Sequence, residues 1–152
     1  MIYAGFDCSS KAVHAAFVDD DENLVDLRKF GSPLKSADDR FYEILDKFND
    51  DLSIITMTAA AIESAIYIQN AKATIAIASV VAGIKYGLHR SGISFVAVDN
   101  NTWKRQVLGK GNAKKPDIMA FAKDMWGDRF PEQDYADAAC IALWRKRYGK
   151  EL

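Results

Sequence analysis

Four carboxylates stand where separate segments of the chain could bring them together. Asp7 follows the apolar run 2–6, and Glu63 follows the apolar stretch 54–62. Asp134 and Asp137 lie three residues apart in DYADAACIALW, a spacing that places two side chains on one face of a helix. Carboxylates that gather in one pocket repel one another, and their removal from water adds a further cost. A divalent cation relieves both costs, so the four acids predict a metal site.

The residue types of this set favour one kind of chemistry. Mg²⁺ prefers hard oxygen ligands at about 2.0–2.1 Å and keeps positions open for water and phosphate. Two such ions about 3.5–4 Å apart can activate a water molecule and stabilise the leaving oxygen when a phosphodiester is hydrolysed. This chemistry needs three or four carboxylates rather than His or Cys ligands, and the set therefore predicts a nuclease.

Each acid, taken alone, also has a simpler interpretation. Asp7 could form a turn by accepting hydrogen bonds from the amides that follow it. Asp134 could cap the N-terminus of the last helix, and Glu63 could pair with a lysine. The prediction of a metal site therefore depends on all four side chains meeting at one end of the fold.

The second half of the chain is basic, although the net charge of the whole is −1. Residues 1–76 carry 7 Lys and Arg against 13 Asp and Glu, whereas residues 77–152 carry 13 against 8. Gly109 and Gly111 would let backbone amides approach a phosphate closely. We therefore interpret the basic residues around these glycines as contacts to the DNA backbone rather than as a solvated loop. They are Lys104, Arg105, Lys110, Lys114 and Lys115.

Hydrophobic periodicity and turn residues divide the chain into short strands and helices. Strands are expected at 2–6, 12–18, 24–30, 54–62 and 93–98. Helices are expected at 37–48, 71–90, 102–108, 116–126 and 133–148. Three strands joined by tight turns predict an antiparallel meander, and the alternation that follows predicts parallel strands. We therefore expect an α/β fold with a five-stranded mixed sheet flanked by helices.

Two of these elements bear on function. Sites in such sheets form at the carboxyl ends of the strands, which is where Asp7 and Glu63 are expected. The helix at 71–90 is apolar around much of its circumference, so it should be buried in the core or at a subunit contact.

Length and composition place the chain among ordinary globular proteins. Its 152 residues, 49% hydrophobic and 27% charged, predict a single domain over 1–152 with a substantial core. No apolar run approaches the roughly 20 residues that span a bilayer, and no signal peptide is expected. Two cysteines in no metal or disulfide pattern favour a reducing, cytoplasmic setting. The other chemically capable residues are interpreted as structural or surface residues: Cys8, His14, His89, Trp103, Trp126 and Trp144.

Four segments together resemble a known family. The segments YAGFDCSS, AAAIESAI, WKRQVLGKGNAKKPD and DYADAACIALW occur in the order and spacing of the RuvC-type Holliday junction resolvases. The resemblance covers most of the chain and is to the compact form found in phages. It implies the ribonuclease H-like fold and a homodimer in the cytoplasm, away from membranes, that cuts branched DNA symmetrically. Four-way junctions, flaps and forks are the candidate substrates.

The resemblance also implies roles for individual residues. Family basic residues fall on Lys104 and on Lys115, the second of which would lie at the edge of the active site and assist catalysis. Water would attack in line and leave a 5′-phosphate and a 3′-hydroxyl. The implied ligands of two Mg²⁺ ions, which Mn²⁺ could replace, are Asp7, Glu63, Asp134 and Asp137.

This chain departs from the family pattern at two places. Family members often have a glycine soon after the first aspartate, where Cys8, Ser9 and Ser10 stand here. Bacterial members have an aromatic residue three positions after the glutamate that helps to open the junction, whereas this chain has Ile66 there, beside Tyr67. Either junction opening or the preferred branched substrate is therefore expected to differ.

A second interpretation is an ATP-binding module of the actin or sugar-kinase type. The segment DCSSK, followed by a hairpin, resembles the first phosphate loop of those proteins. They hold the nucleotide between two lobes, whereas this chain is too short for two lobes and has no second phosphate loop. A DNA-binding protein that has lost cleavage is a third interpretation, disfavoured because all four acids are present.

Overall fold

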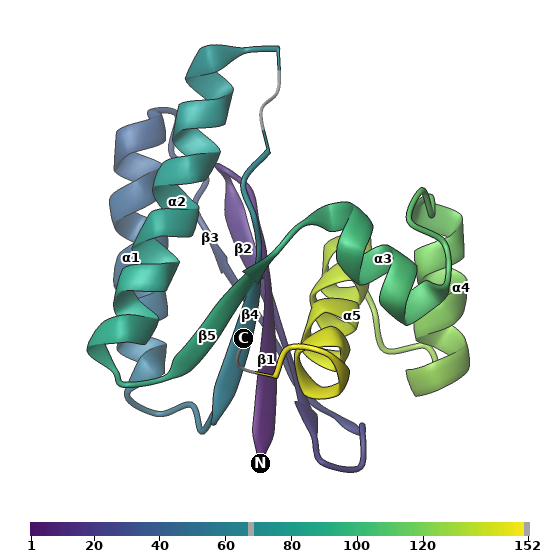
Figure 1. Cartoon of the computed structure of the whole chain (residues 1–152). Helices are drawn as coiled ribbons and strands as arrows, with labels where there is room; N and C mark the ends of the chain where they lie inside the picture. Colours follow the sequence, from purple (N-terminus) through teal and green to yellow (C-terminus); the bar gives the residue numbers. More distant parts are fainter. Residues whose placement is uncertain (67–68, 151–152) are drawn as a thin grey trace.

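A five-stranded sheet forms the centre of the molecule (Figure 1). The computed structural model describes residues 1–66 and 69–150. Its strands are β1 (Ile2–Cys8), β2 (Ala12–Asp19), β3 (Leu24–Gly31), β4 (Ala59–Glu63) and β5 (Ser94–Val98). Across the sheet they follow the order β3-β2-β1-β4-β5, antiparallel from β3 to β1 and parallel from β1 to β5. The predicted mixed α/β sheet is confirmed.

Helices cover both faces of this sheet (Figure 1). The pair α1 and α2 packs on one face, and α5 packs on the other against β1 and β2, with α3 and α4 beside it. The buried apolar side chains of the described residues form three clusters. One surrounds Phe6 and Phe48, a second surrounds Trp103 and Ile141, and a third lies around Val18. The bounds of the helices are α1 (Ala37–Leu52), α2 (Ala71–Arg90), α3 (Asn100–Leu108), α4 (Lys115–Trp126) and α5 (Gln133–Arg147).

The fourth strand is shorter than the sequence predicts. Pairing of β4 with β1 begins at Ala59, opposite Tyr3, so the expected strand over 54–62 is confirmed only in its second half. Ile54 is 71% exposed and precedes the strand. Three consecutive alanines nevertheless form the first three positions of β4, because this strand is buried on both faces and small side chains fit between the sheet and the helices that cover it.

Helix α2 buries only part of its surface within the single chain. Val80, Ile84 and Leu88 face the core, whereas Ile75 and Tyr86 are exposed. Within residues 1–66 and 69–150, α2 is the one helix long and apolar enough, by length and composition, to cross a membrane. The expectation that no segment reaches that length was therefore wrong, because few polar residues interrupt this helix. Because one side of α2 is exposed in the single chain, burial of that side at a subunit contact stays a prediction.

Close packing of α5 on β1 fixes the height of the helix above the sheet. Gly5 lies in β1 beneath Ala138 and Ala142, and a Cβ atom at position 5 would overlap the backbone of both alanines. The small residues of α5 and the absent side chain of Gly5 thus allow an unusually close approach of helix and strand.

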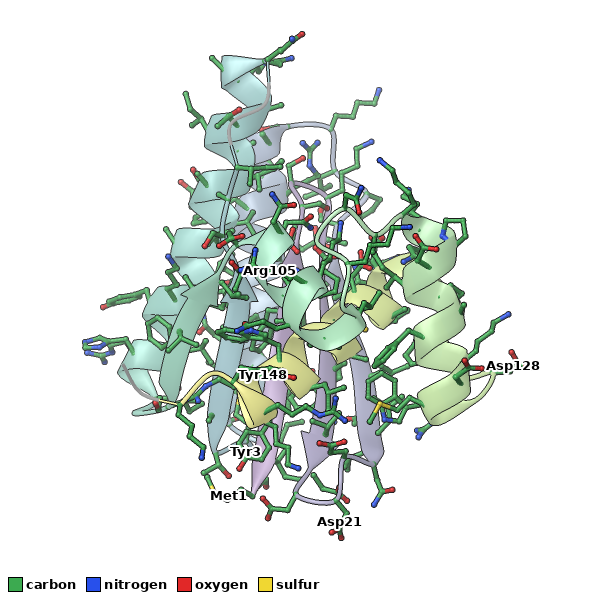
Figure 2. All side chains as sticks on the ribbon, turned by 45° about the vertical axis from the view of Figure 1, so that its right-hand side comes forward. Met1, Tyr3, Asp21, Arg105, Asp128 and Tyr148 are labelled. Atoms are coloured by element: carbon green, nitrogen blue, oxygen red, sulfur yellow. The ribbon has the colours of Figure 1, made fainter. Side chains whose placement is uncertain are left out.

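The C-terminal half of α5 is fixed at the opposite end of the sheet. Glu22, in the turn after β2, accepts hydrogen bonds from Arg147 at 2.6 Å and from Lys146 at 3.1 Å. The Arg147 contact is the main cause that lowers the pKa of Glu22 to about 2. Figure 2 shows the neighbouring Asp21 at the end of the sheet where β1 begins, beside Met1. The end of β1 that carries Asp7 is therefore remote from this anchor.

The packing of Gly5 generates a stability prediction. Gly5→Ala should lower the free energy of unfolding by about 3 kcal/mol or more, since the added methyl group meets backbone atoms that cannot rotate away. Gly31→Ala is the matched control, because Gly31 also lies in a strand but has room for a methyl group. The nearest atom to the added Cβ would be Ala12 Cβ, at an ordinary contact distance of 3.6 Å. Urea unfolding of both variants measures the difference, and equal stabilities would contradict the packing argument.

Candidate functional site

Three of the four predicted acids converge at one end of the sheet. Asp7 stands near the end of β1, and Asp134 and Asp137 stand in the first two turns of α5. One carboxylate oxygen from each lies within 4.8 Å of the others. The spacing of three residues places both helical acids over β1, as the sequence predicts.

Glu63, the fourth predicted acid, stands at the end of β4. Because β4 runs parallel to β1, with Ile62 opposite Phe6, both strands bring their carboxylates to the same edge. The Glu63 carboxylate accepts hydrogen bonds from Trp103 Nε1 at 2.6 Å and from Asn100 Nδ2 at 3.1 Å. Its charge contributes to the raised pKa of both Asp7 and Asp137, so it belongs to the same electrostatic cluster.

The proximity of these acids makes the site strongly negative. Burial raises the pKa of Asp7 well above its usual value, and the charges of Asp137, Glu63 and Asp134 raise it further. Burial likewise raises the pKa of Asp137 to about 6, with a hydrogen bond from Gln133 acting in the opposite direction. Raised pKa values at two neighbouring acids, Asp7 and Asp137, indicate a site that lacks nearby positive charge to stabilise the carboxylates.

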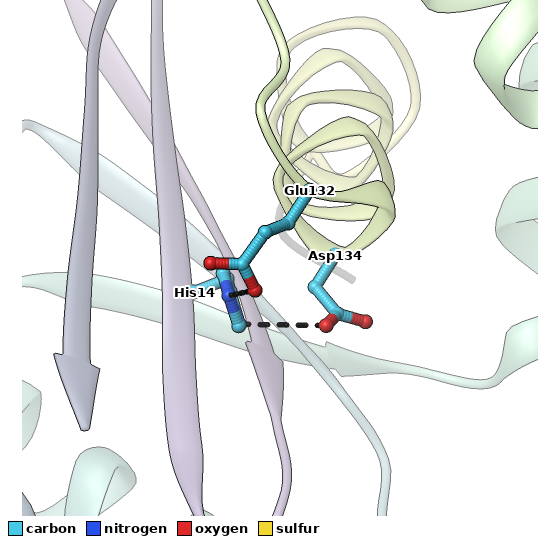
Figure 3. Close-up of side chains that lie close together, drawn as sticks. All are labelled: His14, Glu132 and Asp134. Atoms are coloured by element: carbon cyan, nitrogen blue, oxygen red, sulfur yellow. Dashed lines mark hydrogen bonds and ion pairs between the residues drawn. The ribbon is translucent and has the colours of Figure 1, made fainter. Parts of the chain in front are cut away.

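A row of residues across three strands holds the start of α5 in place. Asp7 pairs in register with His14 of β2, and His14 pairs with Lys29 of β3. His14 is buried, and its Nε2 lies 3.2 Å from Glu132 Oε2 (Figure 3). Lys29 donates to the same carboxylate at 2.8 Å, and His14 Nδ1 lies 3.9 Å from Asp134 Oδ2. The row thereby positions Asp134 beside Asp7.

Several of these partners were missed by the sequence analysis. His14 was interpreted as a structural or surface residue, and it proves to be buried against two carboxylates, which also lie close enough to it to form a potential ligand group. A signal existed, because the tight hairpin after β1 fixes the register that sets His14 opposite Asp7. No comparable signal marked the contacts of Asn100 and Trp103, which depend on where α3 lies relative to β4.

The simpler roles that the acids could have played alone, in a turn, a helix cap or a lysine pair, are not those seen among the described residues. Ser9, rather than Asp7, accepts the amide hydrogen bonds of the turn, from Lys11 and Ala12 at 3.2 and 3.1 Å. Glu132 occupies the N-cap position of α5, so Asp134 is not the cap. Within the described part of the chain, the hydrogen bonds to Glu63 come from an amide and an indole and not from a lysine.

The predicted DNA-contact residues divide into two groups. Lys104, Lys114 and Lys115 line a groove that reaches Asp137, and the charge of Lys104 lowers the pKa of that acid. Lys110 instead lies 3.5 Å from Asp117 of α4. Arg105, labelled in Figure 2, is exposed on α3. Lysine ammonium groups thus border the acidic cluster on the side of α3 and α4.

One of the two departures from the family pattern lies just after β4. Ile66, which stands where bacterial family members have an aromatic residue, is 55% exposed. Tyr67, the neighbouring aromatic residue, lies outside the described residues.

The structural interpretation of the cysteines and tryptophans is supported. Trp103 of α3 and Trp144 of α5 are buried in one core cluster, and Trp126 packs against that cluster. Both cysteines are free thiols, and burial raises the pKa of Cys8, which Asp7 raises further. A protonated thiol is a poor nucleophile, so Cys8 is unsuited to that role.

Comparison with known proteins gives a consistent result. The family model described as crossover junction endodeoxyribonuclease RuvC matches residues 21–145. The curated RuvC of Brachyspira hyodysenteriae is 33% identical over 84 residues, which are 55% of this chain and 52% of that protein. The matched stretch therefore spans about half the length of this relative.

Two solved structures share the fold. Thermus thermophilus RuvC in complex with a Holliday junction substrate has a TM-score of 0.85 at 19% identity, covering 98% of this chain and 94% of that one. A second T. thermophilus RuvC structure has a TM-score of 0.80 at 19% identity, covering 98% and 97%. The ribonuclease H-like architecture expected from the four motifs is thereby confirmed. Because the family model covers most of the sequence, the chain belongs to the RuvC family of crossover junction endodeoxyribonucleases.

Proposed function

We propose that the protein is a metal-dependent endonuclease that cuts four-way junctions or related branched DNA. The observation that carries this proposal is the meeting of Asp7, Asp134 and Asp137 within 4.8 Å, beside Glu63 and a lysine-lined groove. Membership of the RuvC family supports the same activity. We also propose that residues 1–152 act as one nuclease domain and that the enzyme works in the cytoplasm, where its DNA substrate would be.

The donor set fits a hard divalent cation. Every predicted ligand offers carboxylate oxygen, which Mg²⁺ and Mn²⁺ accept. Burial, and after it the charges of the neighbouring acids, raise the pKa of Asp7 and Asp137, and a bound cation would relieve both effects. We propose that two ions are held there, which when bound activate water and stabilise the leaving oxygen. The residues that would hold them are Asp7, Glu63, Asp134 and Asp137.

The lysines beside the acids would bind and orient the DNA backbone. Lys104, Lys114 and Lys115 line one groove with Asp137, so a phosphate placed between them would contact positive charge on one side and the acidic cluster on the other. We propose that Lys115, at the start of α4, offsets the charge of the phosphate that is cut. Such contacts read the backbone and carry no base sequence.

The exposed side of α2 supports a homodimer. Ile75 is 65% exposed and Tyr86 is 64% exposed on this helix. A groove between α1 and α2, lined by Phe41, Tyr42 and Ile75, adds to this apolar surface. Two copies related by a two-fold axis through this surface would present two active sites to two opposed strands.

The ATP-binding interpretation is not favoured. In the expected phosphate loop, the hydroxyl of Ser9 is used to close the turn with Lys11 and Ala12. The acidic residues at the end of β1 would also repel a nucleotide triphosphate in the absence of metal.

A conservative change at Glu63 tests the nuclease. Glu63→Gln removes one negative charge but keeps an oxygen that can accept from Trp103 and Asn100. We expect the fold and junction binding to be retained and cleavage to fall by on the order of 10³-fold or more. Gel analysis of a labelled four-way junction with Mg²⁺ measures the rate, with plain duplex as the control substrate. Nicking by the variant at a rate near that of the native chain would contradict the assignment.

The raised pKa values predict an inverse pH dependence of stability without metal. Asp7 and Asp137 bind protons more tightly in the folded than in the unfolded chain. Their contribution to stability is therefore fully present below the pKa of the unfolded chain, 3.8, and is lost as pH rises through the folded pKa, which is about 6 for Asp137. For Asp137, the difference between 3.8 and about 6 corresponds to roughly 3 kcal/mol at most.

Thermal unfolding in EDTA at about pH 4 and about pH 7.5, which bracket this window, measures the effect. The native chain should lose stability toward pH 7.5 relative to Asp137→Asn, which has no such carboxylate to ionise. Added Mg²⁺ should restore the stability of the native chain at pH 7.5 and change the variant less. Identical pH profiles for the two proteins would argue against a crowded acidic site.

The proposed dimer surface generates a further prediction. Ile75→Asp should shift the protein from dimer to monomer, because a charge would replace an apolar side chain at the contact. Ile54→Asp is the control, since Ile54 is 71% exposed but lies before β4 and away from α2. Light scattering after size-exclusion chromatography gives the mass, and a dimeric Ile75→Asp variant would exclude this surface.

A further inference from the structure

The carboxylate of Glu63 is held by two donors on the same helical turn. Trp103 Nε1 donates to Oε2 at 2.6 Å, and Asn100 Nδ2 donates to the same oxygen at 3.1 Å. Hydrogen bonds from fixed donors to a charged carboxylate are strong and directional. Within residues 1–66 and 69–150, no hydrogen bond reaches Oε1, so the two oxygens of Glu63 have different surroundings.

The backbone fixes these donors relative to Glu63. The register of β4 and β5 sets Glu63 opposite Val98, the last residue of β5, and Ser64 N donates to Val98 O at 2.8 Å. Asp99 then caps α3 by accepting from Thr102 N at 2.8 Å. The first turn of α3 therefore begins directly beside the glutamate.

The indole of Trp103 has little freedom to move. Its side chain is completely buried in the core beneath α5, and Lys104 Nζ lies 5.6 Å from the centre of its ring. Because the indole N–H is already fixed, no side-chain entropy is lost at this donor when a metal binds to Glu63. The glutamate is therefore preorganised as a metal ligand.

We propose that Trp103 and Asn100 are positioning residues that hold Oε2 of Glu63 and leave Oε1 as the oxygen offered to the divalent cation. This inference rests on the proposed metal-dependent nuclease. It adds that α3, whose first turn holds the two donors and whose next residue, Lys104, lines the groove proposed for DNA, sets the affinity of the site for metal. The DNA-contact helix and the metal site would then be parts of one rigid unit.

A purely structural role for Trp103 would have different consequences. Trp144 provides the comparison, since its Nε1 donates at 2.6 Å to Gln106 Oε1 and its ring packs in the same core cluster. The acceptor of Trp144 is a neutral amide of α3, whereas the acceptor of Trp103 is a predicted metal ligand. Loss of either indole N–H should affect folding, but only the loss at Trp103 should affect metal binding.

The test measures Mn²⁺ binding to the full chain without DNA, by electron paramagnetic resonance. Trp103→Phe keeps an aromatic ring in the core and removes the N–H donor, and it should weaken Mn²⁺ binding about 10–100-fold. Trp144→Phe should bind Mn²⁺ as the native chain does. Asn100→Ala, which leaves the core intact, should weaken binding in the same direction and serves as the second variant if Trp103→Phe does not fold.

A kinetic measurement separates positioning from DNA binding. With Mg²⁺ and a four-way junction, Trp103→Phe should need a higher Mg²⁺ concentration for half-maximal cleavage, while its junction affinity in EDTA stays unchanged. If folded Trp103→Phe binds Mn²⁺ with the native affinity, the inference is overturned and the proposed function is not. If Trp103→Phe does not fold, native affinity in Asn100→Ala has the same meaning. Equal weakening by Trp144→Phe would also overturn the inference, as a general effect of the core. A native chain that binds no Mn²⁺ would overturn the proposed function as well.

Discussion

Repulsion among acids at the end of β1 is the constraint on which the rest of the structure depends. Asp7 and Asp137 resist ionisation because they are buried near one another and near Asp134 and Glu63. The chain nevertheless brings them together, because contacts elsewhere are strong enough to hold α5 over the sheet. Those contacts are the close packing on Gly5 and the ion pairs at both ends of the helix. A fold that maintains such repulsion without metal is suited to bind a divalent cation tightly.

The same arrangement connects the proposed metal site to the surface that would meet DNA. The strands β1 and β4 deliver Asp7 and Glu63 to one edge, and β5 leads directly into α3 beside them. The groove lysines stand on α3 and around the start of α4, so a bound backbone would lie across the acids. The lysines would attract a backbone phosphate, and the neighbouring acids would orient it. In the absence of metal, the acids would repel the phosphate, so it would not contact them directly.

The sequence predicts the sheet, the helices and the meeting of three acids at the end of β1, because each depends on local periodicity or on spacing along one element. The pair Asp134 and Asp137 is an example, since a separation of three residues defines a helical face. Contacts between distant elements were beyond this reasoning. The hydrogen bonds from Trp103 and Asn100 to Glu63 require the position of α3, and the link from Lys29 through Glu132 to His14 requires the packing of α5. The beginning of β4 was misplaced because apolar residues at 54–58 resemble a strand but have no partner strand to pair with.

Anomalous X-ray diffraction from crystals containing Mn²⁺, recorded at the manganese absorption edge, is the most direct measurement of whether these acids form a metal centre. Binding at the end of β1 predicts an anomalous peak in contact with Asp7, Asp134 and Asp137, and a second peak that touches Glu63 would support two ions. Peaks confined to other acidic segments, such as the turn around Asp19 and Asp21, with none at the end of β1, would contradict a metal-dependent nuclease.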